Sequence, residues 1–450
     1  MNQEKKEFAR SLVSIALPIS MQSLIQSVLG MIDQIMIGQL GSVSVAAVSL
    51  GGRPCFIMLY GLGGIAAAAS IFASQYEGAK EFERHAHVMR AALALSLAIT
   101  VPFLMLSALF PGLLLSVFTR DAEVISIGKS YLQINSAGYL PLMVTVSCSA
   151  LLRATGHTKI PLVTGFISVA VNTVLNALLI FGLCGFPALG TDGAAMATVI
   201  ARLSECVILA VFMQKKNHPA SIRSAVSCRN EIPFSKLFYL AALPAVANEL
   251  VWALGDAGYT ALYGQMGTEQ LAAMTLTFPV QGLSVGFFSG LSAATGILLG
   301  NTLGAGKFSE AYRLSYKFIS ISIALCLVMA AMLWALAPIY IGLYKVEERT
   351  GTYGRQLLRI FACYLWIKVC NMVIGSGILR SGGKTKYTLF LDVLGTWGIG
   401  IPLGLLGAAV LRLEVTYVYA LLSLEEAVRL VLGLCRVKSK KWMHNLAKTG

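Results

Sequence analysis

Long apolar runs alternate with short polar segments along the whole chain. Each run is about 20 residues or longer, the length that a helix needs to cross the hydrocarbon core of a bilayer. The runs lack the strict apolar–polar alternation of a transmembrane β-barrel. The pattern therefore predicts an all-α polytopic membrane protein. The twelve predicted spans fall near residues 12–38, 44–74, 88–118, 127–152, 161–184, 193–214, 237–264, 270–300, 313–344, 355–380, 388–411 and 414–436.

The second six runs repeat the first six at a nearly constant offset of about half the chain. Leu17-Pro18 returns as Leu243-Pro244, and Leu152-Arg153 returns as Leu379-Arg380. An internal duplication of this kind is typical of transporters, whose binding site lies between two repeats. We expect three parts: a six-helix lobe at residues 1–214, a cytoplasmic linker at 215–235, and a second six-helix lobe with a basic tail at 236–450.

Composition and charge agree with a membrane protein. The chain is 56% hydrophobic and 12% charged, with a mean hydropathy of +0.74, whereas soluble domains carry about 25% charged residues. The net charge of +14 comes from basic residues in short loops between the apolar runs, as the positive-inside bias requires. This distribution disfavours nucleic-acid binding. It predicts a multi-pass protein of a bacterial-type plasma membrane, with both termini in the cytoplasm.

The first run contains an acid, Asp33, within its apolar length. A carboxylate at the centre of a membrane helix costs about 2.5–3.5 kcal/mol on the insertion scales. Gln22, Gln26 and Asp33 share one helical face, so this face is predicted to turn toward the bundle interior. An intramembrane acid indicates a site for an ion, a proton or a substrate. The alternative is an acid that only hydrogen-bonds to a neighbouring helix.

The fifth run carries a polar stripe with one residue in every four. Its members are Thr164, Ser168, Asn172 and Asn176. Neutral oxygens of this kind, together with the charge of Asp33, suit a hard cation such as Na⁺. Thr198 in the sixth run adds a hydroxyl. We therefore predict a cation-coupling site made of Asp33, Asn172, Asn176 and Thr198; the alternative for the asparagines is interhelical hydrogen bonding.

The seventh run, the repeat of the first, has its own acids. Glu249 and Asp256 are two helical turns apart, so they share a face with Trp252 close by. Carboxylates beside aromatic rings suit a lipophilic organic cation or a second ion. Asp392 in the eleventh run is a further candidate for this second site. Lys368 in the tenth run is a rare intramembrane cation, expected to pair with one of these acids.

Motifs of soluble catalysis are missing from the sequence. No P-loop, HExxH or GxSxG pattern occurs, so neither an enzyme nor an ATP-driven pump is expected. The nine cysteines are scattered singly, which favours buried free thiols over a disulfide framework or a metal site. We expect no cofactor, with Na⁺ or H⁺ as the coupling ion.

The motifs MIDQIMIGQLG, QYEGAKEF, LLRATGHTK, GAAMATVIAR, LPAVANELVWALG and ILRSGGKTK, together with the duplication, resemble those of the multidrug and toxic compound extrusion (MATE) family, in its NorM/DinF-like prokaryotic branch. The resemblance runs over almost the whole chain. It implies twelve helices in two lobes and an antiporter that exports organic cations in exchange for Na⁺ or H⁺ by alternating access. It also implies a monomer, with small cationic substrates and membrane lipids as partners.

Several of the family's functional residues match this chain. Asp33 matches the first-helix acid, Asn172 and Thr198 match its polar partners, and Glu249 matches the seventh-helix acid of NorM-like members. Two positions depart from the pattern. Asn176 stands where some members have an acid, and Val369 stands near the tenth-helix acid of some NorM-like members. Asp256 or Asp392 could supply the missing charge.

Two other functions fit the sequence less well than export. A flippase for lipid-linked precursors should line its cavity with several basic residues for phosphate, and we count only Arg202, Lys368 and Arg359 as available for this role. A membrane-embedded enzyme should cluster His, Asp or Ser near one interface, but the five histidines lie mainly in loops and near the termini. Both alternatives are therefore less favoured.

Overall fold

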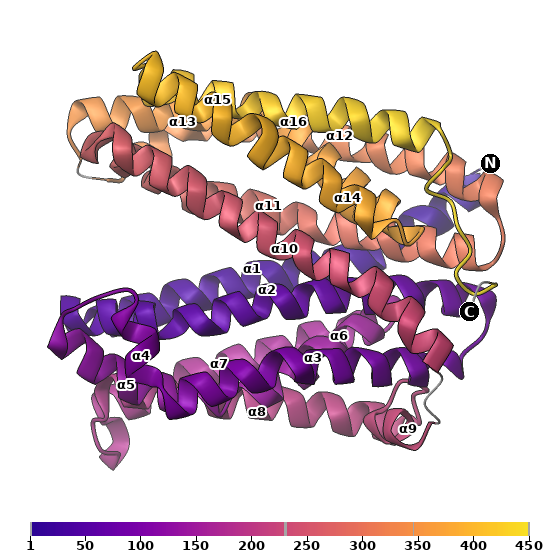
Figure 1. Ribbon diagram of the computed structural model, residues 1–450, viewed down its shortest axis with the longest axis horizontal. Helices are drawn as coiled ribbons and strands as arrows, with labels where there is room; N and C mark the ends of the chain where they lie inside the picture. The colour runs from indigo at the N-terminus through magenta and orange to yellow at the C-terminus, as the bar shows by residue number, and fades with distance from the viewer. Residues whose placement is uncertain (1, 229–231, 345, 449–450) are drawn as a thin grey trace. The chain divides into compact units, whose positions relative to one another are not determined.

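The computed structural model describes residues 2–228, 232–344 and 346–448 (Figure 1). Within these ranges the regular secondary structure is helical, so the predicted all-α class is confirmed. The helices of the first half are α1 (Asn2–Gly38), α2 (Ser42–Ala79), α3 (Arg84–Leu109), α4 (Pro111–Ser116), α5 (Ala122–Ser136), α6 (Tyr139–Ala154), α7 (Lys159–Phe181), the 3-10 turn η1 (Leu183–Gly185), α8 (Gly190–Lys215) and α9 (Ile222–Ser227).

The second half repeats this pattern with more interruptions. Three π-helical segments lie in the tenth and eleventh spans, and such segments are frequent at functional sites. The elements are α10 (Ile232–Met266), α11 (Thr268–Gly304), α12 (Phe308–Gly342), α13 (Glu348–Met372), η2 (Val373–Leu379), α14 (Thr385–Asp392), η3 (Val393–Gly400), α15 (Ile401–Leu405), η4 (Leu406–Val410) and α16 (Val415–Lys438).

All twelve predicted apolar runs are helical. In the described part of the chain, ten helical stretches are long and apolar enough to cross a membrane, and α5 with α6, bent by 48°, forms an eleventh span. The twelfth run is α16, which carries Glu425, Glu426 and Arg429 within its length. With these three charges inside it, α16 is not among the stretches that are long and apolar enough to cross a membrane by length and composition.

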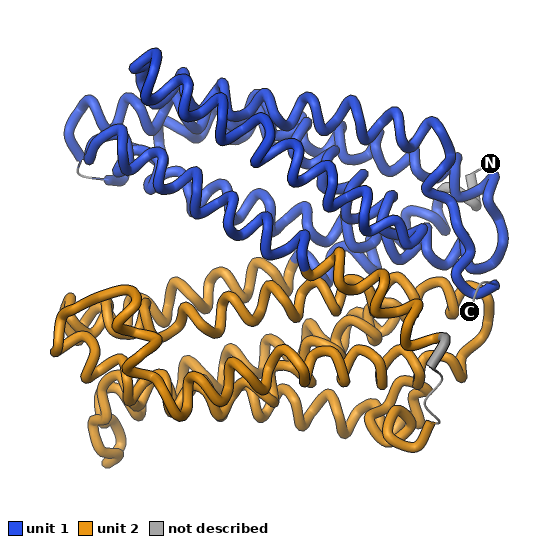
Figure 2. Tube along the Cα trace, viewed as in Figure 1, with its two compact units in different colours: residues 1–20, 247–449 blue, residues 21–246, 450 orange. Residues whose placement is uncertain are grey.

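The helices form two compact units (Figure 2). Unit 1 contains Met1–Ser20 and Ala247–Thr449, and unit 2 contains Met21–Val246. The predicted division into 1–214 and 236–450 differs from these units, because α1 and α10 each begin in one unit and end in the other. The crossing points follow Ser20 and Val246, which occupy equivalent positions of the internal repeat.

Close contacts at two glycines join the first part of α1 to unit 1 and the first part of α10 to unit 2. A Cβ on Gly290 of α11 would overlap the backbone of α1 at Ala16 and Ser20. A Cβ on Gly64 of α2 would likewise overlap the backbone of α10 at Val246. Gly64 and Gly290 are also equivalent positions of the repeat. The duplication has thus preserved one small-residue helix contact, the kind that lets membrane helices approach closely.

Apolar and aromatic contacts reinforce these two crossings. In unit 1 the rings of Phe8 and Phe318 lie 5.5 Å apart, and Ser20 Oγ donates to the Phe287 carbonyl at 2.5 Å. In unit 2 the rings of Phe72 and Phe234 lie 5.9 Å apart in an edge-to-face arrangement. The first part of α1 is therefore a packed element of unit 1, and the first part of α10 is a packed element of unit 2.

Candidate ion-binding and substrate-binding sites

Unit 2 contains the polar residues that the sequence singled out for ion coupling. Asn176 Nδ2 donates to Asp33 Oδ1 at 2.6 Å and to Asn172 Oδ1 at 3.1 Å. Asn172 Nδ2 in turn donates to Thr198 Oγ1 at 3.4 Å. The structure thus brings all four predicted residues together from α1, α7 and α8. Their role as an ion site stays a prediction.

The spacing of the α7 stripe accounts for this geometry. Its four members lie one turn apart, and all are buried. Thr164 Oγ1 donates to the Pro161 carbonyl and Ser168 Oγ to the Ala201 carbonyl, so the hydroxyls of these two residues are engaged by backbone. Of the four side chains in the stripe, those of Asn172 and Asn176 are therefore the ones available to the site around Asp33. The stripe is therefore divided between helix packing and the candidate site.

Close packing of α7 and α8 brings Thr198 into reach. A Cβ on Gly193 would overlap the backbone of Leu179, so only glycine permits this approach. Within the site, Asn176 Oδ1 is buried and has no hydrogen-bond partner among the described residues. A buried amide oxygen without a donor is unfavourable, and a cation or a protonated group would satisfy it. The site therefore offers a carboxylate, an unpartnered amide oxygen and further neutral oxygens.

Gln22, which shares a face of α1 with Asp33, has a different partner. Arg153 Nη1 donates to Gln22 Oε1 at 3.1 Å. Gly165 of α7 lies beside this side chain and the carboxylate of Glu205. On this face of α1, Gln22 thus contacts Arg153, whereas Asp33 contacts Asn176 of α7.

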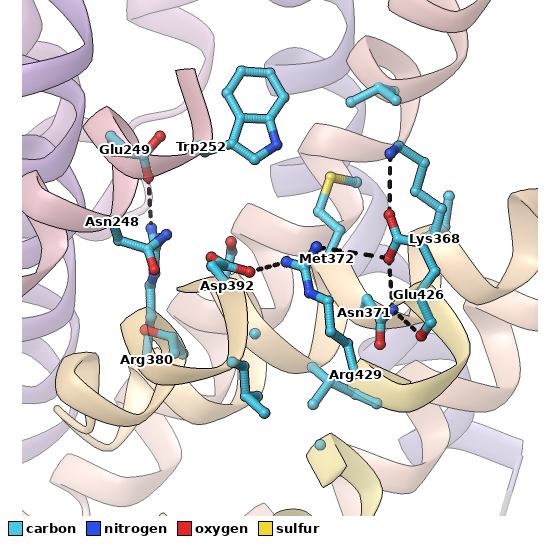
Figure 3. Close-up of a pocket in the computed structure, with 18 residues that line it drawn as sticks. Asn248, Glu249, Trp252, Lys368, Asn371, Met372, Arg380, Asp392, Glu426 and Arg429 are labelled. Atoms are coloured by element: carbon cyan, nitrogen blue, oxygen red, sulfur yellow. Dashed lines mark hydrogen bonds and ion pairs between the residues drawn. The ribbon is translucent and has the colours of Figure 1, made fainter. Parts of the chain in front are cut away.

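Unit 1 contains a cavity of about 260 Å³ (Figure 3). Three of the four residues predicted for the second site line it: Glu249, Trp252 and Asp392. Asp256 does not line the cavity and is exposed on α10. The cavity also includes Asn248, which is 3% exposed and whose Oδ1 is buried without a hydrogen-bond partner in the described chain.

Opposite charges line this cavity in pairs. Arg380 Nη1 lies 3.0 Å from Glu249 Oε1, and Lys368 Nζ lies 3.1 Å from Glu426 Oε1. Arg429 is in direct contact with Asp392. Figure 3 shows the Glu249–Arg380 pair on one side, Lys368 with Glu426 on the other, and Asp392 with Arg429 between them. Three acids and three bases leave the lining without net charge.

The partner of Lys368 differs from the prediction. The sequence-based expectation was Glu249, Asp256 or Asp392, whereas the observed partner is Glu426 on α16. Asn371, one turn from Lys368 on α13, donates from Nδ2 to Glu426 Oε2 at 2.7 Å. Lysine and asparagine from one helix face thus hold one carboxylate of α16. This pairing depends on how α13 packs against α16, which residue spacing does not reveal.

Sequence reasoning missed Arg380, Glu426 and Arg429 as site residues. Arg380 was noticed only as part of a repeated motif. Glu426 and Arg429 lie one helical turn apart inside the twelfth apolar run, and charges at such a depth mark functional sites by default. The rule that singled out Asp33, a charged residue inside an apolar run, therefore applies equally to Glu426 and Arg429 of α16.

Comparison with protein-family models matches two segments of the chain, one in each half of the internal repeat. A family model described as MatE matches residues 18–178 and 244–406. The two matched segments begin at Pro18 and Pro244, which are equivalent positions of the internal repeat. Together they cover more than half of the chain.

Curated relatives extend over nearly the full length. The probable multidrug resistance protein YoeA of Bacillus subtilis (strain 168) is 24% identical, with 93% of this chain and 90% of that protein covered. The probable multidrug resistance protein NorM of Geobacillus kaustophilus (strain HTA426) is 27% identical, with 88% and 87% covered.

Solved structures with the same fold cover 96% of this chain and of their own chains. A MATE crystallised in complex with MaL6 has a TM-score of 0.86 at 19% identity. A MOP superfamily transporter from Pyrococcus furiosus, described as having reverse polarity of its binding pocket, has a TM-score of 0.85 at 18% identity. At these identities the likeness concerns the fold, and it confirms the predicted two-lobe arrangement of twelve helices.

Proposed function

The chain belongs to the MatE family of multi-pass membrane transporters associated with multidrug efflux, and we propose that it is an antiporter that exports lipophilic organic cations in exchange for Na⁺ or H⁺. It works by alternating access in a bacterial plasma membrane, with both termini in the cytoplasm. It acts as a monomer and uses no cofactor.

The coupling step is assigned to the site around Asp33. The observation that carries it is the contact of Asp33 with Asn176, whose Oδ1 is buried without a partner among the described residues. A Na⁺ ion takes oxygen ligands, and Asp33, Asn176, Asn172 and Thr198 supply a carboxylate, two amide oxygens and a hydroxyl. A proton on Asp33 would serve the same purpose by neutralising the carboxylate. Either ion removes an uncompensated charge from the interior of unit 2.

The substrate step is assigned to the cavity of unit 1. Trp252 is 43% exposed and offers a ring face to a lipophilic cation. Asn248 Oδ1 is an unpartnered acceptor, within the described chain, for a substrate N–H group. Glu249 supplies charge, and a cationic substrate competes with Arg380 for it. When a cationic substrate occupies the cavity, its positive charge replaces that of Arg380 as the partner of Glu249.

The same cavity weighs against export of lipid-linked phosphates. Sequence reasoning found too few bases for phosphate, and the structure adds Arg380 and Arg429 to Lys368. Each of these bases already faces a carboxylate. A phosphate would have to displace that carboxylate and leave it buried and unpaired, which is strongly unfavourable. A cation needs only to replace the basic partner.

The test uses purified protein in liposomes loaded with a cationic dye. Na⁺ and pH gradients are imposed separately across the membrane, and dye movement is followed by fluorescence. We expect dye transport to follow one of the two gradients and to stop when an ionophore collapses that gradient. Dye transport that is unaffected by either gradient would contradict the proposal.

A further inference from the structure

Glu425 and Glu426 are consecutive on α16 and equally buried, at 6% and 5% exposure. Their surroundings differ. Glu426 faces Lys368 at 3.1 Å and receives a hydrogen bond from Asn371 at 2.7 Å. In the described chain, no basic side chain forms an ion pair with Glu425, and its Oε2 is buried without a hydrogen-bond partner. One carboxylate is thus compensated and its neighbour is not.

Two glycines form the compartment that holds Glu425. A Cβ on Gly400, at the end of η3, would overlap the hydroxyl of Tyr259 and the carboxyl of Glu425. A Cβ on Gly255 of α10 would overlap Thr396 of η3. Glycine at both positions lets α10, η3 and α16 meet around one carboxyl group. The side chains of Tyr259 and Thr396 lie beside the Glu425 carboxyl in this compartment and interact with it.

The charges that face Glu425 are already balanced without it. The facing titratable groups are Glu426, Lys368, Tyr259, Tyr263 and Arg429. Lys368 is neutralised by Glu426, and Arg429 is neutralised by Asp392. Ionised Glu425 would therefore add an unmatched negative charge to the interior of a membrane protein, which costs several kcal/mol. The balanced state is the one in which Glu425 is a neutral carboxylic acid.

We propose that Glu425 is a second ion-exchange group of the transporter, holding a proton that it releases when a cation enters the cavity of unit 1. Its neighbour Glu426 lines that cavity, so a positive charge arriving there lies close to Glu425. The O–H bond of the carboxyl breaks, its electron pair stays on the carboxylate, and the proton passes to water. The entering cation takes over the charge balance. Reprotonation follows when the cation leaves.

This inference rests on the proposed exchange of cations, but its first test needs no transport. Dicyclohexylcarbodiimide reacts with a protonated carboxyl in apolar surroundings. The acid proton moves to a carbodiimide nitrogen, the carboxyl oxygen bonds to the central carbon, and rearrangement leaves a stable N-acylurea. Purified protein is treated at near-neutral pH, digested and mapped by mass spectrometry. We expect labelling at Glu425 and about tenfold less labelling at the ion-paired Glu426.

A cationic probe links the label to the cavity. Tetraphenylphosphonium at saturating concentration should reduce labelling of Glu425, and a pH-sensitive dye in weakly buffered solution should detect released protons. The E425Q variant should release fewer protons than the original chain on addition of tetraphenylphosphonium. Equal labelling of Glu425 and Glu426, or proton release from E425Q equal to that of the original chain, would overturn the proposal.

Folding controls separate this role from a structural one. E425Q places a neutral amide where the neutral acid stands, so its thermal unfolding midpoint should be unchanged. E426Q leaves Lys368 without its carboxylate partner, so its midpoint should fall. A large fall for E425Q with none for E426Q would show that Glu425 is the compensated, ionised carboxylate, and the assignment would be wrong. If dye transport fails under every gradient while Glu425 is still labelled, only the proposed transport is contradicted.

Discussion

Arg380 Nη1 donates to Glu249 Oε1 at 3.0 Å in the wall of the unit 1 cavity. The first half of the chain contains the same contact in neutral form, since Arg153 Nη1 donates to Gln22 Oε1 at 3.1 Å. Arg380 is the repeat equivalent of Arg153, and Glu249 directly follows Asn248, which is the equivalent of Gln22. Each unit therefore contains an arginine that donates a hydrogen bond to a side chain in the first helix of its repeat. The acceptor is an amide in unit 2 and a carboxylate in unit 1.

The Glu249→Gln variant should fold and lose transport of cations. The Arg153–Gln22 contact shows that a glutamine amide accepts an arginine N–H at a neighbouring position of the repeat, so the contact with Arg380 should survive. A cationic substrate would lose a partly desolvated charge partner, which corresponds to about 2–5 kcal/mol in related truncations. A dose–response of efflux should show this loss for a cationic dye and a smaller one for a neutral compound of similar size.

The matched control is Glu269→Gln, because Glu269 is also paired with an arginine, Arg349, but does not line the cavity. This control should keep both activities. Equal losses for the cationic and the neutral compound in Glu249→Gln would remove Glu249 from charge recognition.

A Gly290→Ala substitution should destabilise unit 1. The added methyl group would overlap the backbone of α1 at Ala16 and Ser20, and overpacking of this kind costs about 1–3 kcal/mol. Gly64→Ala should have a comparable effect at Val246 in unit 2. Gly282→Ala on α11 is the control, because its Cβ would meet no atom within 4 Å. The readout is the thermal unfolding midpoint in detergent, and an unchanged midpoint for Gly290→Ala would contradict the close crossing of α1 and α11.

Lowering the pH should destabilise the folded conformation of the loop that follows α8. His218 is buried, and its Nδ1 accepts a hydrogen bond from the Ala220 N–H at 3.1 Å, which leaves the ring proton on Nε2. Burial and the nearby His157 and His85 lower the pKa of His218 from 6.5 to about 4. The unfolded chain then binds the proton more readily than the folded one. The contribution of His218 to stability is full above about pH 6.5 and is lost as the pH falls toward about 4.

The measurement is the unfolding midpoint as a function of pH for the original chain and for His218→Gln. Glutamine does not titrate, so the variant should lose part of the decline in midpoint on acidification. The same decline in both proteins would show that His218 does not contribute to it.

Membrane orientation can be tested with single cysteines. Cys184 is exposed in the turn between α7 and α8, and Lys216 is exposed at the other end of α8. If the termini are cytoplasmic, a membrane-impermeant maleimide added to intact cells should label Cys184. A cysteine introduced by Lys216→Cys, with the nine native cysteines replaced by serine, should react only after the cells are opened. Labelling of the Lys216→Cys variant from outside would reverse the proposed orientation.

The spans and the polar face of α7 could be predicted because both follow from periodicity along single helices, whereas the grouping of Asp33 with Asn172 and Thr198 was also supported by the family resemblance. Apolar run length predicted the helices, and the four-residue spacing placed Asn172 and Asn176 on one face of α7. The pairing of Lys368 with Glu426 could not be predicted in this way. It depends on the packing of α13 against α16, and no spacing within either helix specifies that contact. The crossing of α1 after Ser20 was also missed, because its signal is a single glycine on another helix.

The most direct test of the central claim is gradient-driven dye efflux by Asp33→Asn in liposomes. The variant keeps the size of the side chain but can neither release a proton nor supply a negative charge to Na⁺. Asp192→Asn is the matched control, since Asp192 accepts a hydrogen bond from Ser130 in the same unit and lies outside the site. We predict that Asp33→Asn loses gradient-driven efflux by at least about tenfold, with its unfolding midpoint preserved, while Asp192→Asn retains it. Full gradient-driven efflux by Asp33→Asn would contradict the assignment of ion coupling to this site.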